Sequence, residues 1–157
     1  MAKHAYTIEL EWTGNSGSGT SSYRDYSRSH LIRAAGKPCI QGSSDPVFRG
    51  DAGKYNPEEM LLAALSACHM LWYLHLCAEA GVIVTAYTDS AHGRMQMNDN
   101  GSGQFNEAEL MPLVVVQHES MIKKAQQLHL DAHAMCFISR SVNFPVHIRP
   151  RASLIQN

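Results

Sequence analysis

The chain has 157 residues, of which 45% are hydrophobic and 17% are charged. This length is that of about one typical domain, so the sequence predicts a single domain over residues 1–157 and excludes a solvated disordered chain. The thirteen basic and fourteen acidic residues nearly cancel, and no basic run is longer than Lys123-Lys124, which argues against a nucleic-acid partner.

The N-terminal segment 1–12 contains charged side chains and lacks the continuous apolar stretch of a secretory signal peptide. Four cysteines without CxxC or CxxH spacing are too few for a disulfide scaffold. The sequence therefore predicts a cytoplasmic protein.

The first third of the chain has the pattern of strands and loops. Residues 5–12 alternate between apolar and polar side chains, which predicts a half-buried strand, and the glycine-rich segment 14–20 predicts a flexible loop. Residues 28–34 and 39–40 flank a turn at Gly-Lys-Pro and predict a hairpin, and residues 43–56 are expected to be irregular.

A long helix is predicted to begin at Pro57, because Asn56 is a good N-cap and acidic residues follow in the first turn. Gly81 is expected to end it. Residues 60–78 carry no formal charge and reach the length of a membrane span, but polar side chains interrupt them. A helix that is apolar on all sides is also typical of a soluble core or an oligomer interface. We therefore expect a buried helix and no membrane partner.

The second half of the chain predicts more strands and a second helix. Residues 82–97 and 104–117 are expected to form two long strands joined by a Gly/Asn-rich loop, and residues 142–155 an edge strand that contains two prolines. A helix is predicted over residues 118–134, where four apolar residues share one face: Met121, Ala125, Leu128 and Ala132. Together the elements predict an α+β fold.

The cysteines differ in their surroundings. Cys39 falls in a predicted strand and Cys77 near the end of the long helix, so both are expected to be small hydrophobic side chains of the core. Cys68 and Cys136 are packed thiols, metal ligands, or a redox pair in which one thiolate attacks a peroxide and the other resolves the sulfenic acid. The residue pattern alone does not raise the redox interpretation above packed thiols.

A metal site is the weakest of the three interpretations. Its ligands would be His129, His133 and Cys136, which share one face if the helix continues that far, with His69 or Cys68 as the fourth. No closely spaced ligand pair from a loop supports such a site. We therefore expect neither a metal nor another cofactor.

Two separated strings resemble the signatures of one protein family. NPEEMLLAALSACH, over residues 56–69, and AHAMCFISRS, over residues 132–141, are similar to the signatures of the OsmC/Ohr family of osmotically inducible and organic hydroperoxide resistance proteins. The strand order and the long helix fit as well, so the resemblance covers nearly the whole chain. It implies an α+β fold with antiparallel strands around a central helix, and an intertwined homodimer.

The resemblance also implies a chemistry. Organic hydroperoxides would be reduced to alcohols, with Cys68 as the peroxidatic and Cys136 as the resolving cysteine, and an external dithiol, of lipoyl type in the family, would reduce their disulfide. Apolar side chains around Cys68 would favour a hydrophobic peroxide, and the candidates are Leu65, Met70 and Trp72.

Glu58 matches the acidic residue of the family that positions an arginine against the reactive thiolate. We prefer Arg28 and Arg49 over Arg24 for that arginine. Ten residues separate Glu58 from Cys68, which on one helix corresponds to roughly 15 Å along the axis and about 80° around it. Either an intervening arginine spans this gap or Glu58 comes from the partner's helix, and we expect the partner's helix.

Two residues depart from the pattern of the family. Phe137 follows Cys136 where relatives commonly have proline, and His69 follows Cys68 where many have phenylalanine. These departures keep a second function open, that of a catalytically silent dimer that binds a small hydrophobic ligand.

Overall fold

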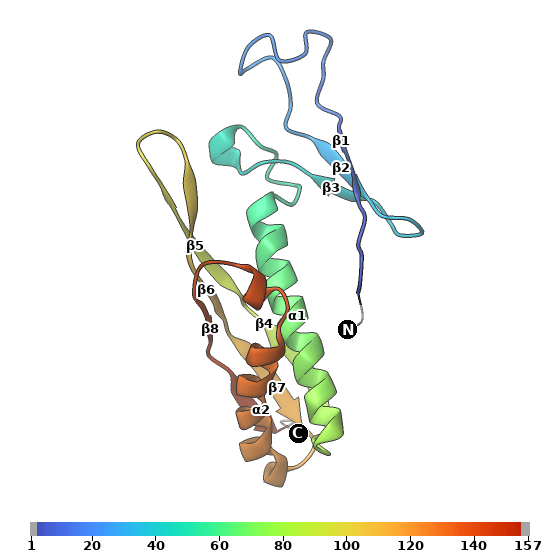
Figure 1. The fold of residues 1–157 in the computed structure, drawn as a ribbon, viewed down its shortest axis with the longest axis vertical. Helices are drawn as coiled ribbons and strands as arrows, with labels where there is room; N and C mark the ends of the chain where they lie inside the picture. Colours follow the sequence, from blue (N-terminus) through green and yellow to red (C-terminus); the bar gives the residue numbers. More distant parts are fainter. Residues whose placement is uncertain (1–2, 155–157) are drawn as a thin grey trace. The chain divides into compact units, whose positions relative to one another are not determined.

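The computed structural model describes residues 3–154, which fall into two compact units that divide after Met60. Strands and helices follow one another in both units, so the predicted α+β class is confirmed (Figure 1). The division into two compact units does not decide how many domains the chain has, so a single domain over residues 1–157 stays a prediction.

The first unit contains a three-stranded antiparallel sheet in the order β1-β2-β3. Its strands are β1 (Glu9–Trp12), β2 (His30–Arg33) and β3 (Ile40–Gly42), and a 3-10 helix, η1 (Pro46–Phe48), follows. The predicted hairpin is confirmed. The first strand is shorter than predicted, and all four of its residues are exposed rather than half-buried.

Helix α1 (Pro57–Glu79) has the predicted limits because its ends are determined by local contacts. The Asn56 side chain accepts a hydrogen bond from the Glu59 amide at 2.8 Å, and the Glu59 carboxylate accepts one from the Asn56 amide at 3.1 Å. This reciprocal pair is a capping box. At the other end Gly81 has a φ of 71°, the left-handed conformation that terminates helices.

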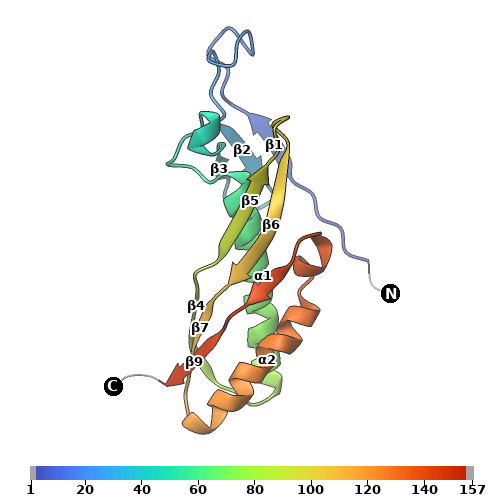
Figure 2. The same ribbon diagram turned by 90° about the vertical axis from the view of Figure 1, so that its left-hand side faces the viewer.

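The prediction of two long strands in the second unit is wrong, because each is broken in the middle. The first becomes β4 (Val84–Asp89) and β5 (His92–Met97), and the second β6 (Gly103–Leu110) and β7 (Pro112–Val116). At the break the Asp89 side chain accepts a hydrogen bond from the Met111 amide at 2.7 Å, so a side chain replaces the strand ladder there. The four strands thus contribute to two sheets (Figure 2). The sheets have the orders β5-β6-β8, with β8 at Val146–Ile148, and β4-β7-β9, with β9 at Arg151–Leu154.

The C-terminal segment forms two short strands instead of one. They are β8 (Val146–Ile148) and β9 (Arg151–Leu154), with Pro150 between them. Each lies at the edge of its sheet, as predicted, and pairs in parallel with β6 or β7. Position 155 of the predicted strand lies outside the described residues.

Helix α2 (Ile122–Met135) begins later than predicted, because a 3-10 turn, η2 (Glu119–Met121), precedes it. Its expected inner face is confirmed by the burial of Ala125, Leu128 and Ala132. The helix ends before Cys136, whose backbone is extended with a ψ of 108°. A 3-10 turn, η3 (Ser139–Ser141), follows.

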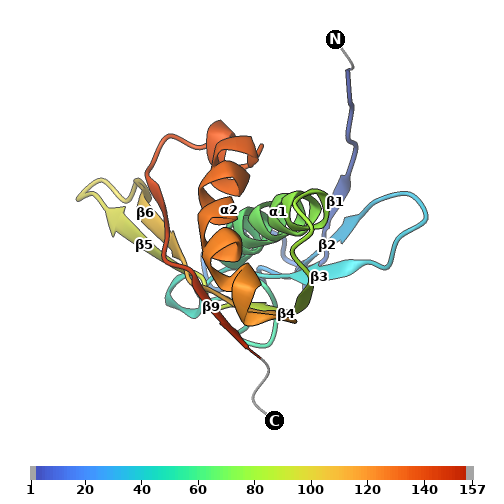
Figure 3. The same cartoon turned by 90° about the horizontal axis from the view of Figure 1, so that it is seen from below.

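Both long helices pack on the strands of the second unit (Figure 3). Helix α1 is long and apolar enough to cross a membrane by length and composition, but it packs into the core through one stripe of buried residues four positions apart: Leu65, His69, Tyr73 and Cys77. The prediction of a buried helix is confirmed for this stripe. Leu71, on another face, is 63% exposed in the single chain, and burial of that face at an interface stays a prediction.

Candidate active site

The structure brings two of the predicted site residues together. Cys68 lies in the middle of α1 and Cys136 directly after the last residue of α2, and the Cys68 thiol is near enough to raise the pKa of Cys136. Both are free thiols. The two thiols are therefore neighbours that belong to different elements of the fold.

The two thiols differ in access. Cys136 is only 1% exposed. Cys68 is half-buried and lines a groove of about 390 Å³ together with apolar and aromatic side chains, namely Leu71, Trp72, His75 and Phe137. The rings of Trp72 and Phe137 meet edge to face with centroids 5.5 Å apart. A small apolar molecule in this groove would have access to Cys68 but not to the buried Cys136.

Burial also distinguishes the chemistry of Cys136. It raises the pKa of the Cys136 thiol to about 11, and the neighbouring Cys68 thiol adds to the increase. The Ser139 amide donates a hydrogen bond to the Cys136 sulfur at 3.4 Å, which opposes part of the shift. Cys136 is therefore a protonated thiol at neutral pH and a weak first nucleophile.

The remaining cysteines stand apart from this pair. Cys77 is buried in the core around Tyr73, as predicted, and burial raises its pKa. The prediction for Cys39 is wrong, because this residue lies just before β3 and is exposed. The sheet of the first unit does not cover that position.

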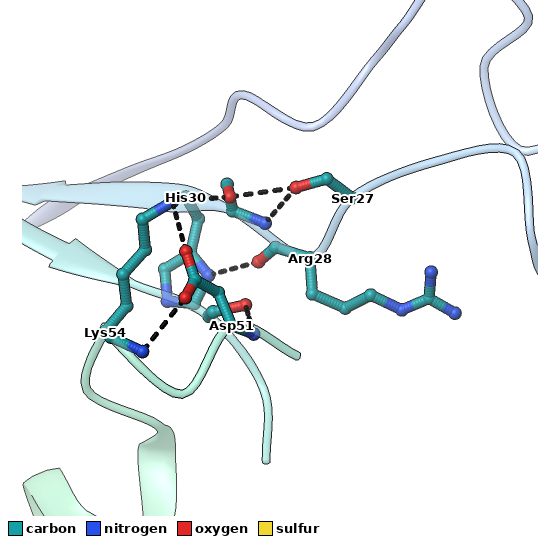
Figure 4. Close-up of polar contacts among 8 residues, drawn as sticks. Ser27, Arg28, His30, Asp51 and Lys54 are labelled. Atoms are coloured by element: carbon teal, nitrogen blue, oxygen red, sulfur yellow. Dashed lines mark hydrogen bonds and ion pairs between the residues drawn. The ribbon is translucent and has the colours of Figure 1, made fainter. Parts of the chain in front are cut away.

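Arg28 is held by its own loop. Its guanidinium lies 4.3 Å from the centroid of the Tyr23 ring and 4.1 Å from that of Tyr26, and it donates hydrogen bonds to both backbone carbonyls. Figure 4 shows the side chain extending away from Asp51 and Lys54, which pair with each other at 3.3 Å. The stacked rings and the two hydrogen bonds give this guanidinium a fixed direction.

Arg49 and Glu58 have fewer contacts. Arg49 ends η1 in the left-handed conformation, with a φ of 64°, and its guanidinium forms no ion pair within residues 3–154. Glu58 lies in the first turn of α1. Both belong to the first unit, as Arg28 does, and the two thiols to the second. The approach of these three residues to Cys68 therefore stays a prediction.

A buried pair of histidines joins α1 to α2. His69 and His129 are 0% and 1% exposed, and Nε2 of His69 lies 3.0 Å from Nδ1 of His129. The ring of Tyr73 stacks on His129 with centroids 3.8 Å apart, and its hydroxyl donates to the Ala125 carbonyl at 3.1 Å. Burial lowers the pKa of His69 to about 4 and that of His129 to about 3, so both rings are neutral at pH 7.

The outer nitrogens of this pair lack partners. Nδ1 of His69 and Nε2 of His129 are buried and make no hydrogen bond within the described residues. An unsatisfied buried polar group costs ~1–3 kcal/mol, whereas two apolar side chains of similar shape at the same places would cost nothing of this kind. The histidine pair therefore stabilises the fold less than two apolar side chains at the same positions would.

The candidate ligands of the metal interpretation, which was the weakest of the three, do not form a site in the described residues. Within residues 3–154 no group of three or more His, Cys, Asp or Glu side chains is arranged to hold a metal ion. The helix ends at Met135, so Cys136 does not continue the helical face of His129 and His133, and His129 is paired with His69 instead.

Comparison with known sequences identifies the family. The sequence model described as OsmC-like protein matches residues 50–151, well over half of the chain. The chain belongs to the OsmC-like family. The matched region includes Glu58, Cys68 and Cys136, whereas Arg28 and Arg49 precede it. No curated protein sequence matches this OsmC-like chain.

Solved structures agree with this assignment. An OsmC-like protein of unknown function from Vibrio cholerae is 28% identical with a TM-score of 0.82, over 98% of this chain and 100% of the other. An organic hydroperoxide resistance protein from Elizabethkingia anophelis is 21% identical with a TM-score of 0.67, over 98% and 100%. The organic hydroperoxide resistance protein OhrB of Bacillus subtilis is 15% identical with a TM-score of 0.60, over 96% and 98%. The last two likenesses show that this OsmC-like chain shares their fold.

The sequence identified only part of the groove. Of the three apolar candidates around Cys68, Trp72 lines the groove, whereas Leu65 is buried in the core and Met70 is not part of the lining. Leu71, His75 and Phe137 were missed. Helical spacing would have indicated Leu71 and His75, since they lie three and seven residues after Cys68 and share its face of the helix.

Proposed function

We propose that this OsmC-like protein is a thiol-dependent peroxidase that reduces organic hydroperoxides to alcohols in oxidative stress defence. One observation carries the proposal: two free thiols are near enough for Cys68 to raise the pKa of Cys136, and Cys68 lines an apolar groove while Cys136 is buried. This arrangement supports Cys68 as the peroxidatic and Cys136 as the resolving cysteine. The solved relatives named organic hydroperoxide resistance proteins agree with it.

In the first step the Cys68 thiolate attacks the distal oxygen of the hydroperoxide. The O–O bond breaks, the alkoxide leaves and takes a proton to become the alcohol, and Cys68 becomes a sulfenic acid. A guanidinium, from Arg28 or Arg49, would stabilise the thiolate and the departing alkoxide, and Glu58 would hold that guanidinium in place. The apolar lining favours a substrate with an organic group over hydrogen peroxide.

In the second step the Cys136 sulfur attacks the sulfenic sulfur of Cys68. A disulfide forms, the Cys136 proton leaves with the hydroxyl as water, and Cys68 is protected from further oxidation. An external dithiol of the lipoyl type then restores both thiols while it becomes a disulfide itself. The Ser139 amide beside the Cys136 sulfur supports the negative charge that this attack requires.

We further propose that the protein acts as a cytoplasmic homodimer. Helix α1 is apolar on all sides but buried along one stripe only, and exposed apolar surface of this extent is typical of an interface. A second copy of the chain that covers this face would shield both Leu71 and the groove beside Cys68.

The decisive test is the activity of Cys68→Ser. Purified protein with a dithiol is expected to consume cumene or tert-butyl hydroperoxide, and the variant is expected to lose at least 1,000-fold in rate, on the order of the loss when a nucleophile is removed. Cys39→Ser, which changes the exposed cysteine, is the matched control and should retain full activity. Normal turnover by Cys68→Ser would exclude the peroxidase and leave the silent binding dimer as the better function.

A second prediction concerns the disulfide. One equivalent of organic hydroperoxide is expected to link Cys68 to Cys136 within one chain, because the two thiols are neighbours and Cys68 raises the pKa of Cys136. Cys39 and Cys77 should stay reduced. Peptide mapping under non-reducing conditions measures this directly, and a dominant bridge that contains Cys39 or Cys77 would contradict the assignment.

A further inference from the structure

The buried histidine pair lies between the two elements that carry the thiols. His69 is the residue after Cys68 on α1, and His129 is seven residues before Cys136 on α2. Within the described residues, their hydrogen bond is the only one between side chains of the two helices, and the bond from the Tyr73 hydroxyl to the Ala125 carbonyl is the one other polar contact there. The polar connection between the helices is thus concentrated beside the thiols.

The remaining contacts between α1 and α2 are apolar and involve small side chains such as Ala125 and Ala132. Apolar contacts are not directional, whereas a hydrogen bond weakens steeply with distance and angle. The contact of 3.0 Å between the rings of His69 and His129 therefore fixes how far one helix can slide along the other. Tyr73 stacks on His129 and limits the rotation of that ring.

Disulfide formation needs such a fixed register. Its geometry restricts the separation of the two Cα atoms and the direction of the two Cβ atoms, and a slip of one helical residue is about 1.5 Å. We propose that His69 and His129 are positioning residues that hold α1 and α2 in the register in which Cys136 reaches Cys68. The proposal rests on the proposed function of the two thiols.

One feature of the pair favours positioning over a purely structural role. Both rings have an unpartnered buried nitrogen, so the site is less stable than an apolar one of the same shape. Buried polar pairs that lower stability are best attested where they specify register. Replacing both histidines by leucine should thus preserve the fold while loosening the register.

The test measures the equilibrium constant for exchange between the Cys68–Cys136 disulfide and glutathione. The free thiols are trapped chemically and the peptides are then mapped. This measurement needs no peroxide. The double variant His69→Leu/His129→Leu is expected to keep or raise the urea midpoint of unfolding while the equilibrium constant for the disulfide falls at least tenfold, about 30 mV. His129→Asn is the matched control, because its amide places a polar atom near the position of Nδ1. The equilibrium constant for the disulfide in this variant should stay within threefold of the wild-type value. Leu130→Ala, on the exposed face of α2, should change nothing.

An unchanged equilibrium constant in the double variant would overturn the proposal. So would an equal loss in His129→Asn, because the hydrogen bond would then not be the cause. These outcomes are separate from the fate of the peroxidase. A wild-type protein that forms the disulfide normally in glutathione but consumes no hydroperoxide would refute the proposed function and leave the positioning role intact.

Discussion

Between pH 6.5 and pH 4 the protein is expected to lose stability steeply. One buried imidazole alone lowers the free energy of unfolding by an amount on the order of 3 kcal/mol over this range. The cause is the pair His69 and His129, whose pKa values burial lowers to about 4 and about 3. Burial lowers the pKa of His133 as well, which acts in the same direction.

The sign follows from proton binding. An unfolded histidine takes up a proton near pH 6.5, whereas these buried rings stay neutral until the pH approaches 4. In this window the unfolded chain binds more protons, so stability is complete above pH 6.5 and is lost as the pH falls. Urea titrations at intervals of half a pH unit measure the effect.

The double variant His69→Leu/His129→Leu is the control for this prediction. It should retain most of its urea midpoint down to pH 4.5, with a residual slope from His133. A wild-type midpoint that stays constant from pH 7 to pH 4.5 would contradict the buried neutral pair.

The features that could be predicted from the sequence depend on neighbouring residues. The limits of α1 follow from Asn56, Glu59 and Gly81, which act within one turn of each helix end. The buried face of α2 follows from its apolar spacing. The family signatures in turn pointed to Cys68 and Cys136, and in the structure the Cys68 thiol is near enough to raise the pKa of Cys136.

The features that could not be predicted depend on distant residues. The breaks in the long strands involve Asp89, whose side chain bonds the Met111 amide 22 positions away. Sixty positions separate His69 from His129, and no spacing rule relates them. Cys39 lies just before β3 and is exposed, and the apolar character of a residue does not specify where a strand begins or which of its positions are covered.

The variants Cys68→Ser and Glu58→Ala are each expected to be inactive. Activity is expected to return when one chain of each variant combines in a mixed dimer. Ten residues of helix separate Glu58 from Cys68, roughly 15 Å, so a carboxylate does not readily serve a thiolate on its own helix. If Glu58 comes from the partner, a mixed dimer has one complete site. Random exchange makes half of the dimers mixed, so about a quarter of all sites should be intact.

The matched control mixes Cys68→Ser with Cys136→Ser. Since both cysteines of a site belong to one chain, this mixed dimer contains no complete thiol pair and should stay inactive. Hydroperoxide consumption is measured after partial unfolding and refolding, with exchange verified by mass spectrometry of the intact dimer. A fully exchanged mixture of Cys68→Ser and Glu58→Ala that stays inactive, or an active monomer, would rule out the shared site. Activity in that mixture alone would mean that the catalytic carboxylate and the reactive thiol come from different chains, so the peroxidase would require the dimer.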